Sequence, residues 1–385
     1  MSEPTTQAPP EDPADGRDLR PNLGAMLSRS GGLRLERRLD TRPVHEFYAT
    51  VAALAITAVL IGGLVALAGV SPTDAYSALY DGAFGSVESA LETLVQATPL
   101  ILTGLAAAVA FRAGVWNIGG EGQFFAGAMG AYFVSTLVGP LPAPLLFVAM
   151  FVGGAIAGAL WASIASVLLV RYGTNEILTT VMLNFVILYG LSWLLAGPWQ
   201  SPKTPYYQTE RMDAKTFLPR FVDDSRLHWG FAIALLAAVA VYFLVQRTSL
   251  GYELRGVGVN RTAAAYKGIH VGAVVIAVMA ISGALAGISG AGELLGLHHR
   301  LQLDIAAGIG FTGIIIALVA RLNPAGVVVV AIAFAGLLNG STSMQVGTGI
   351  PAALVEVIEG VALFLVLLAA VACRYRLRRR RQIHD

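Results

Sequence analysis

A short polar segment, GVWNIGGEGQFFAG at residues 114–127, interrupts a sequence that is otherwise strongly apolar. Its side chains include groups that could hydrogen-bond a small polar solute, and these belong to Asn117, Glu121 and Gln123. Its glycines permit a tight turn or close helix packing, and those beside the polar residues are Gly119, Gly120 and Gly122. We therefore predict a helix break, at which Glu121 caps the returning helix. Asn117 and Gln123 either line a transport pathway or bond the exposed backbone.

A second polar pattern lies in TNEILTTVMLN, at residues 174–184. Glu176, Thr180 and Asn184 recur every four residues, which places them on one face of a helix. Polar groups within membrane helices either line a pathway or hydrogen-bond neighbouring helices. Both roles are open for Asn184, whereas Glu176 also suits the first turn of its helix. Gln345, in an uncharged segment, is a further candidate for the mouth of the pathway.

The residue patterns of common catalytic sites are missing from the sequence. A Walker A loop needs Gly-Lys-Ser/Thr, but none of the three lysines follows a glycine. There is no H-E-x-x-H motif, and the single cysteine, Cys373, cannot form a cysteine-based metal site. The adjacent His298 and His299 are too few for such a site. We therefore expect no catalytic residue, metal site or cofactor in this chain.

The composition is typical of a membrane protein. Hydrophobic residues make up 56% of the chain and charged residues 13%, against about 25% charged in soluble domains. About ten segments could cross a bilayer as helices, near 47–70, 94–112, 121–138, 144–170, 176–197, 229–246, 270–290, 305–320, 324–340 and 354–373. Several are short and glycine-rich, which indicates broken helices. We predict an all-α polytopic bundle over 45–373, with a disordered cytoplasmic tail at 1–44 and a basic cytoplasmic tail at 374–385.

The distribution of basic residues predicts the orientation of this bundle. If both termini are cytoplasmic, most of the 26 lysines and arginines fall on the inner side, as the positive-inside rule requires. The expected outer segments 71–93 and 341–353 contain no basic residue. We therefore expect a multi-pass protein of the cell (inner or plasma) membrane with cytoplasmic N- and C-termini.

The longest predicted cytoplasmic loop, at about 247–269, contains a short capped helix. Asn260 is a favourable N-cap, and Gly268 suits the position just after the helix. The helix could simply tie two spans together, but the loop resembles the coupling segment of ABC transporter permeases, which docks on the ATPase subunit. That resemblance assigns ATPase coupling to Asn260, Ala263, Ala264, Tyr266, Lys267 and Gly268. Thr262 departs from it, because many permeases have an acidic residue there.

Three segments resemble one branch of these permeases. NIGGEGQ at 117–123 and TNEILTTVMLN at 174–184 are similar to signatures of the permeases for nucleosides and related sugars. GFTGIIIALVARLNPAGVV at 310–328 also resembles that family. The motifs cover roughly residues 95–370, and the segment at 174–184 favours the nucleoside branch over ribose-type permeases.

The resemblance implies the membrane-spanning permease subunit of an ATP-driven ABC importer that takes up nucleosides or related simple sugars. It also implies three partners, namely a second homologous permease in a heterodimer, a cytoplasmic ABC ATPase that binds ATP and Mg²⁺, and an extracellular substrate-binding lipoprotein. The alternative is a secondary transporter of a small polar solute, driven by an ion gradient. The sequence leaves open which nucleoside or sugar is carried, and whether the second permease is another copy of this chain.

Overall fold

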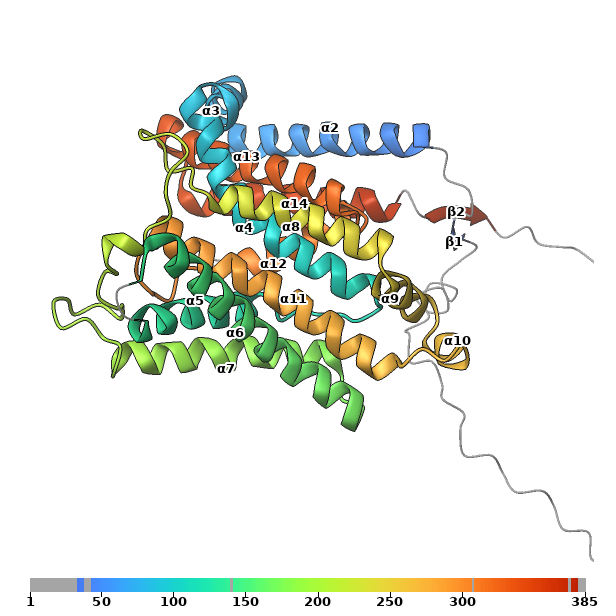
Figure 1. Cartoon of the computed structure of the whole chain (residues 1–385). Coiled ribbons are helices and arrows are strands. Elements are labelled where there is room, and N and C mark those ends of the chain that lie inside the picture. The colour runs from blue at the N-terminus through green and yellow to red at the C-terminus, as the bar shows by residue number, and fades with distance from the viewer. Residues whose placement is uncertain (1–32, 38–42, 139–140, 307, 373–374, 380–385) are drawn as a thin grey trace, which may run out of the picture. The chain divides into compact units, whose positions relative to one another are not determined.

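The computed structural model describes residues 33–37, 43–138, 141–306, 308–372 and 375–379 (Figure 1). The chain divides into two units, one comprising residues 1–49 with 371–385 and the other residues 50–370. In the first unit, strands β1 (Leu33–Arg37) and β2 (Tyr375–Arg379) pair antiparallel. The sequence did not predict these strands, which lie within the two segments that we expected to be tails. Most of the remainder of those segments lies outside the described residues.

Helices make up almost all of the regular structure in the described part of the chain. Their bounds are α2 (Pro43–Leu67), α3 (Pro72–Phe84), α4 (Val87–Arg112), α5 (Gly120–Leu137), α6 (Ala143–Tyr172), α7 (Glu176–Ala196), η1 (Ala214–Thr216), α8 (Gly230–Arg247), α9 (Ser249–Val259), α10 (Arg261–Tyr266), α11 (Val271–Glu293), the π-helical turn η2 (Leu294–His298), α12 (Ile309–Val319), α13 (Pro324–Thr348) and α14 (Ala352–Ala372). Each segment predicted to span the membrane therefore coincides with a helix.

Six of the described helices are long and apolar enough to cross a membrane, namely α4, α6, α7, α8, α11 with its π turn, and α13. A seventh span results if residues 55–67 of α2 and all of α3 count as one, although these two helices are bent by 117°. α12 is apolar but short. By length and composition alone, the structure thus supports a multi-pass helical protein with fewer certain spans than the ten expected.

The structure differs from the sequence-based expectation in two outer segments. α3 is a helix where a loop was expected, and its first residue is Pro72, which suits the first helical position because its missing N–H has no helical partner there. α13 continues to Thr348, eight residues beyond the predicted end of its span, so Gln345 lies in a helix rather than in a loop. Gly349, with φ of 72°, then ends that helix in the left-handed conformation.

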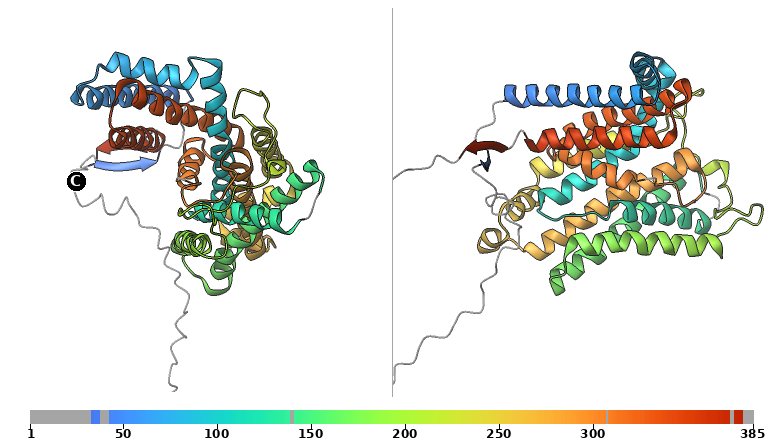
Figure 2. Two further views of the ribbon diagram at one scale, coloured as in Figure 1. Left: turned by 90° about the vertical axis from the view of Figure 1, so that its left-hand side faces the viewer. Right: turned by 180° about the vertical axis from the view of Figure 1, so that it is seen from behind.

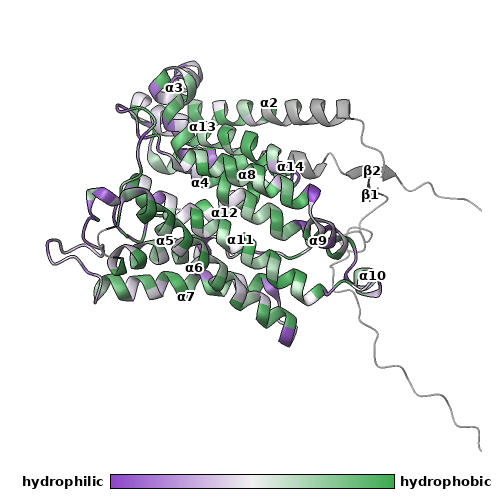
Figure 3. Ribbon diagram, viewed as in Figure 1, coloured by the Kyte–Doolittle hydropathy of each residue, from purple (hydrophilic) through white to green (hydrophobic). Residues whose placement is uncertain are grey.

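α4 forms the centre of the larger unit, where it packs against α8, α11, α12 and α13 (Figures 1 and 2). Its most apolar stretch is 89% buried, against 22% for α7 and 28% for both α6 and α8. The apolar side chains of α6, α7 and α8 remain largely exposed, and Figure 3 shows these helices as predominantly hydrophobic. Such faces suit contact with lipid, which indicates that α4 is shielded from the bilayer by its neighbours.

Close backbone contact holds α11 against α5 and α6. A Cβ atom at Gly287 would lie 2.3 Å from the Gly154 carbonyl oxygen on α6, and one at Gly127 on α5 would lie 2.2 Å from the Gly287 Cα. No side chain larger than hydrogen fits at either position without moving a helix. Small residues at helix interfaces allow this close approach in membranes, and here they bring the polar residues of α5 and α11 together.

Candidate functional site

The polar segment at 114–127 forms the connection between α4 and α5. Gly114 adopts φ of 68°, a left-handed conformation that favours glycine. The chain then re-enters the helical bundle at Gly120, the first residue of α5. Asn117 and Gln123 are both 2% exposed, so the segment carries its amide groups into the protein interior.

Asn117 and Gln123 hydrogen-bond each other in both directions. The Asn117 Nδ2 donates to the Gln123 Oε1 at 3.0 Å, and the Gln123 Nε2 donates to the Asn117 Oδ1 at 2.9 Å. Asn117 also donates to the Ser282 Oγ of α11 at 2.9 Å and accepts from the backbone N–H of Gly119. All the hydrogen-bonding groups of the Asn117 side chain are thus occupied by this chain.

Thr180 and Asn184 of α7 bind the backbone of the same segment. The Ile118 N–H donates to the Thr180 Oγ1 at 3.2 Å. The Asn184 Oδ1 accepts from the Gly122 N–H at 2.8 Å, while its Nδ2 donates to the Ile118 carbonyl at 3.0 Å. These two side chains therefore satisfy buried backbone groups at the break that would otherwise be unpaired.

We expected Glu121 to cap its own helix, but the structure shows that it does not. The cap position of α5 is Gly119, without a side-chain hydrogen bond. The Glu121 carboxylate instead accepts from the N–H of Gly308 at 2.9 Å and of Gly310 at 2.7 Å, at the start of α12. A carboxylate is favourable there because it meets free N–H groups and the positive end of the helix dipole. The break between α4 and α5 is therefore joined to α12, about 190 residues further along the chain.

The remaining pathway candidates lie apart from this network. Glu176 is the first residue of α7 and is half-buried. Its helix is capped by Asn175, whose Oδ1 accepts from the N–H groups of Ile177 and Leu178. Gln345 is half-buried near the end of α13. The structure thus brings Asn117, Gln123, Thr180 and Asn184 together, but neither Glu176 nor Gln345 hydrogen-bonds to them through its side chain.

The predicted coupling loop contains two helices, α9 and α10, rather than one. The Asn260 Oδ1 accepts from the Ala263 N–H at 3.0 Å, and Gly268 adopts φ of 82° just past the end of α10. Tyr266 is 90% exposed, whereas Ala264 is 3% exposed and packs inward. A cleft of about 480 Å³ lies beside this helix, with lining residues that include Tyr252, Glu253, Lys267, Ile269 and His270.

The coupling loop is also in direct contact with the polar segment. The Arg261 Nη2, at the start of α10, donates to the Gly114 carbonyl at 2.9 Å. A Cβ atom at Gly258, in the last turn of α9, would lie 1.9 Å from the Arg112 carbonyl oxygen. The end of α4 therefore lies against the backbone of α9, and the Arg261 side chain of α10 is hydrogen-bonded to the polar segment.

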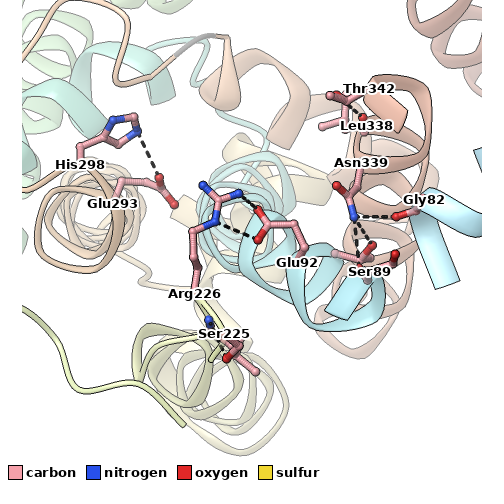
Figure 4. Close-up of polar contacts among 12 residues, drawn as sticks. Gly82, Ser89, Glu92, Ser225, Arg226, Glu293, His298, Leu338, Asn339 and Thr342 are labelled. Carbon is pink, nitrogen blue, oxygen red and sulfur yellow. Dashed lines mark hydrogen bonds and ion pairs between the residues drawn. The ribbon is translucent and has the colours of Figure 1, made fainter. Parts of the chain in front are cut away.

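The opposite end of the bundle holds polar contacts that sequence reasoning missed (Figure 4). Arg226 binds both carboxylate oxygens of Glu92, and the His298 Nε2 lies 3.7 Å from a Glu293 carboxylate oxygen. Asn339 of α13 donates to the Gly82 carbonyl at 2.8 Å and to the Ser89 carbonyl at 3.1 Å. The only available signal was the presence of these charged and amide residues near the ends of apolar segments.

Two segments at this end are paired through their backbones. The N–H groups of Thr209, Met212 and Leu218 donate to carbonyls within residues 295–301. His299 stacks on Phe217 with ring centroids 3.7 Å apart. Burial and secondly the charge of Arg211 lower the pKa of His299 to about 4.

His228 is the most buried histidine of this region, at 1% exposed. Its Nδ1 accepts from the Gly230 N–H at 3.1 Å, which requires that nitrogen to be unprotonated. Burial and secondly the nearby His299 lower the pKa of His228 to about 4. Within the described residues, no group of three or more His, Cys, Asp or Glu side chains is placed to hold a metal ion.

Comparison with known proteins shows which protein family the chain resembles. The sequence profile described as "Branched-chain amino acid transport system / permease component" matches residues 89–367. The chain is 36% identical to the glucose ABC transporter permease protein TsgB13 of Haloferax volcanii, over 89% of this chain and 94% of that protein. It is also 36% identical to the guanosine ABC transporter permease protein NupP of Bacillus subtilis, over 79% and 88%. The Bacillus guanosine permease NupQ is 27% identical, over 63% and 78%.

Proposed function

The chain belongs to the permease-component family of transport systems whose profile matches residues 89–367, and on that premise we propose that it is the permease subunit of an ABC importer for nucleosides or simple sugars. The observation that carries the proposal is 36% identity, over most of both chains, to permeases named for glucose and for guanosine. Within that choice, the motif at 174–184 supports nucleosides.

The family supplies the reason to propose partners. An ABC permease carries no ATPase of its own, so a cytoplasmic ATPase would bind ATP and Mg²⁺ and drive transport. An extracellular binding protein would deliver the substrate. Bacillus subtilis has two guanosine permeases that resemble this chain, NupP and NupQ, which supports a heterodimer of this chain with a second permease.

The docking surface for the ATPase would be the α9–α10 region. Tyr266 and Val259 are 90% and 84% exposed there, and exposed aromatic residues are common anchors of protein interfaces. The bond from Arg261 to the Gly114 carbonyl would then carry a displacement of α10 to the break between α4 and α5. The same orientation would place both termini in the cytoplasm, as the distribution of basic residues favours.

Transport assays distinguish this proposal from a secondary transporter. The chain would be reconstituted in liposomes with a second permease, an ATPase and a binding protein from the same organism, and uptake of labelled guanosine and glucose would be measured. We expect guanosine uptake that requires internal ATP and stops with vanadate. Uptake that survives vanadate and ATP depletion but stops with a protonophore would establish the secondary transporter instead. Uptake of glucose alone would assign the chain to the sugar permeases.

A further inference from the structure

Glu293 has a buried carboxyl group that makes no hydrogen bond to any described residue. It is the last residue of α11 and is 5% exposed. The imidazole beside it is that of His298, whose Nε2 lies 3.7 Å from a Glu293 carboxyl oxygen, which is beyond hydrogen-bonding distance. Within the described residues no donor reaches its carboxylate oxygens. Buried polar groups are usually hydrogen-bonded, so this carboxyl group is available to a hydrogen-bonding partner from outside the chain.

The contacts between α11 and α4 show where the carboxylate lies. The Ser282 Oγ donates to the Ala106 carbonyl at 2.7 Å, and the Ser289 Oγ donates to the Pro99 carbonyl at 3.2 Å. As residue numbers rise along α11 they fall along α4, so the two helices run antiparallel. Glu293 follows one turn after Ser289 on the same face, and continuation of this register places it level with residue 95 of α4, between Glu92 and Gln96.

The polar side chains at this level differ in whether they already have hydrogen-bond partners. Arg226 has its guanidinium engaged by Glu92, and Figure 4 shows this ion pair beside Glu293. Gln96 is half-buried, and within the described residues its side-chain amide has no hydrogen bond. The Arg226 side chain is 58% exposed, so the cluster reaches the surface at this end. Within the described residues, the cluster therefore offers one carboxyl group and one amide without a hydrogen-bond partner.

We propose that Glu293 is a substrate-binding residue, whose carboxyl group hydrogen-bonds hydroxyl groups of the transported molecule while Gln96 supplies a second polar contact. This inference rests on the proposed function. Adjacent hydroxyls are the donors that a nucleoside and a simple sugar share, and carboxylates bind ribose hydroxyls in nucleotide-binding proteins. Glu293 thereby selects substrates by the sugar rather than by the base.

The test pairs a protein change with a substrate change in the complete importer in liposomes. Uptake kinetics of guanosine and of 2′,3′-dideoxyguanosine are compared for the wild type and for Glu293→Gln. We expect the substitution to lower kcat/KM for guanosine up to roughly tenfold, the usual range for the loss of one hydrogen bond. It should leave dideoxyguanosine uptake unchanged. Because the binding protein is the same throughout, its own preference cancels from the ratio between variant and wild type.

The matched control is Glu359→Gln, the same change at a half-buried glutamate that already accepts a hydrogen bond from Ser341. It should not alter the ratio between the two substrates. Co-purification of the ATPase reports assembly, and Glu293→Asp keeps a carboxylate if the first variant fails to assemble. The aspartate variant should still prefer guanosine to dideoxyguanosine.

Two results would overturn the inference. One is an equal loss of uptake for both substrates in Glu293→Gln with the ATPase still bound, which would make the carboxylate a structural partner of His298. The other is no change for either substrate. Failure of the proposed function is recognised separately, because the wild-type importer would then take up neither guanosine nor glucose, and the inference would fall with it.

Discussion

Asn117, Gln123 and Asn184 use their side-chain hydrogen bonds on other parts of the same chain. The amide groups of Asn117 and Gln123 bond each other, and Asn184 bonds the backbone at Ile118 and Gly122. Their residue types suit both a substrate and a helix break, and in this conformation the break occupies them. The role that we predicted for them in the pathway stays a prediction, and the structure adds a second role that can be measured.

Asn184→Leu tests that structural role. The substitution leaves the Gly122 N–H and the Ile118 carbonyl without their partner, and unpaired buried groups cost about 1–3 kcal/mol. We expect a lower unfolding temperature in detergent. The control is Met182→Leu, an apolar change at a residue of the same helix that is 48% exposed. An unchanged unfolding temperature combined with a higher KM would instead make Asn184 a substrate contact.

At the scale of elements, the helices α9 and α10 have one face that is buried against the bundle and one face that is exposed. Ala264 packs inward while Tyr266 points outward, a distinction that the sequence could not make within the run of alanines. The capped geometry of α10 follows from local chemistry at Asn260 and Gly268, whereas the bond from Arg261 to Gly114 joins residues 147 positions apart.

Tyr266→Ala is expected to weaken ATPase docking without unfolding the chain. Loss of an exposed aromatic anchor at an interface costs 1–2 kcal/mol or more, so co-purification of the ATPase and ATP-driven uptake should each fall about tenfold. Tyr206→Ala is the matched control, because Tyr206 is 72% exposed but lies in the long segment between α7 and α8. Equal effects of the two substitutions would remove Tyr266 from the interface.

The paired segments at 209–218 and 295–301 are expected to loosen in acid, because His299 lies in the second of them and His228 packs against it at Gly296. Both histidines have a pKa near 4 in the fold, against about 6.5 in an unfolded chain. The released segments therefore bind more protons than the docked ones between pH 6.5 and 4. Docking is fully stable above about pH 6.5 and weakens as the pH falls through this window.

Amide hydrogen exchange of residues 208–218, corrected for the intrinsic effect of pH, measures this docking. Protection should be lower at pH 5 than at pH 7.5, and His228→Gln should reduce the difference. The control His270→Gln changes an exposed histidine at the start of α11 and should leave the difference intact. Identical protection at the two pH values would contradict the prediction.

At the scale of the whole molecule, the number of membrane crossings and the side on which the ends lie are the main open predictions. Six helices are long and apolar enough to cross, and a seventh depends on the bent pair formed by α2 and α3. α5, α12 and α14 complete the ten segments that the sequence predicts. The Glu121 carboxylate of α5 accepts hydrogen bonds at the start of α12, which is compatible with short, interrupted spans.

Labelling with an impermeant maleimide tests the orientation in intact cells. Starting from a variant with Cys373→Ser, single cysteines are placed at exposed positions, one at Tyr266 and one at Tyr206. We expect labelling of the Tyr206 position from outside and of the Tyr266 position only after the cells are opened. The reverse pattern would invert the bundle and would rule out α10 as an ATPase contact.

Local chemistry allowed the sequence by itself to determine the membrane class, the positions of the helices, the cap at Asn260 and the resemblance to nucleoside permeases. These features depend on residues within a few turns of one another, where hydrophobic length and capping preferences act directly. Only the tertiary structure decided which partner each polar group takes. Glu121 bonds the start of α12 instead of its own helix, and Arg226 pairs with Glu92 across 134 residues. The physical reason is that a carboxylate or an amide accepts any donor within reach, and the packing of distant helices determines which donor that is.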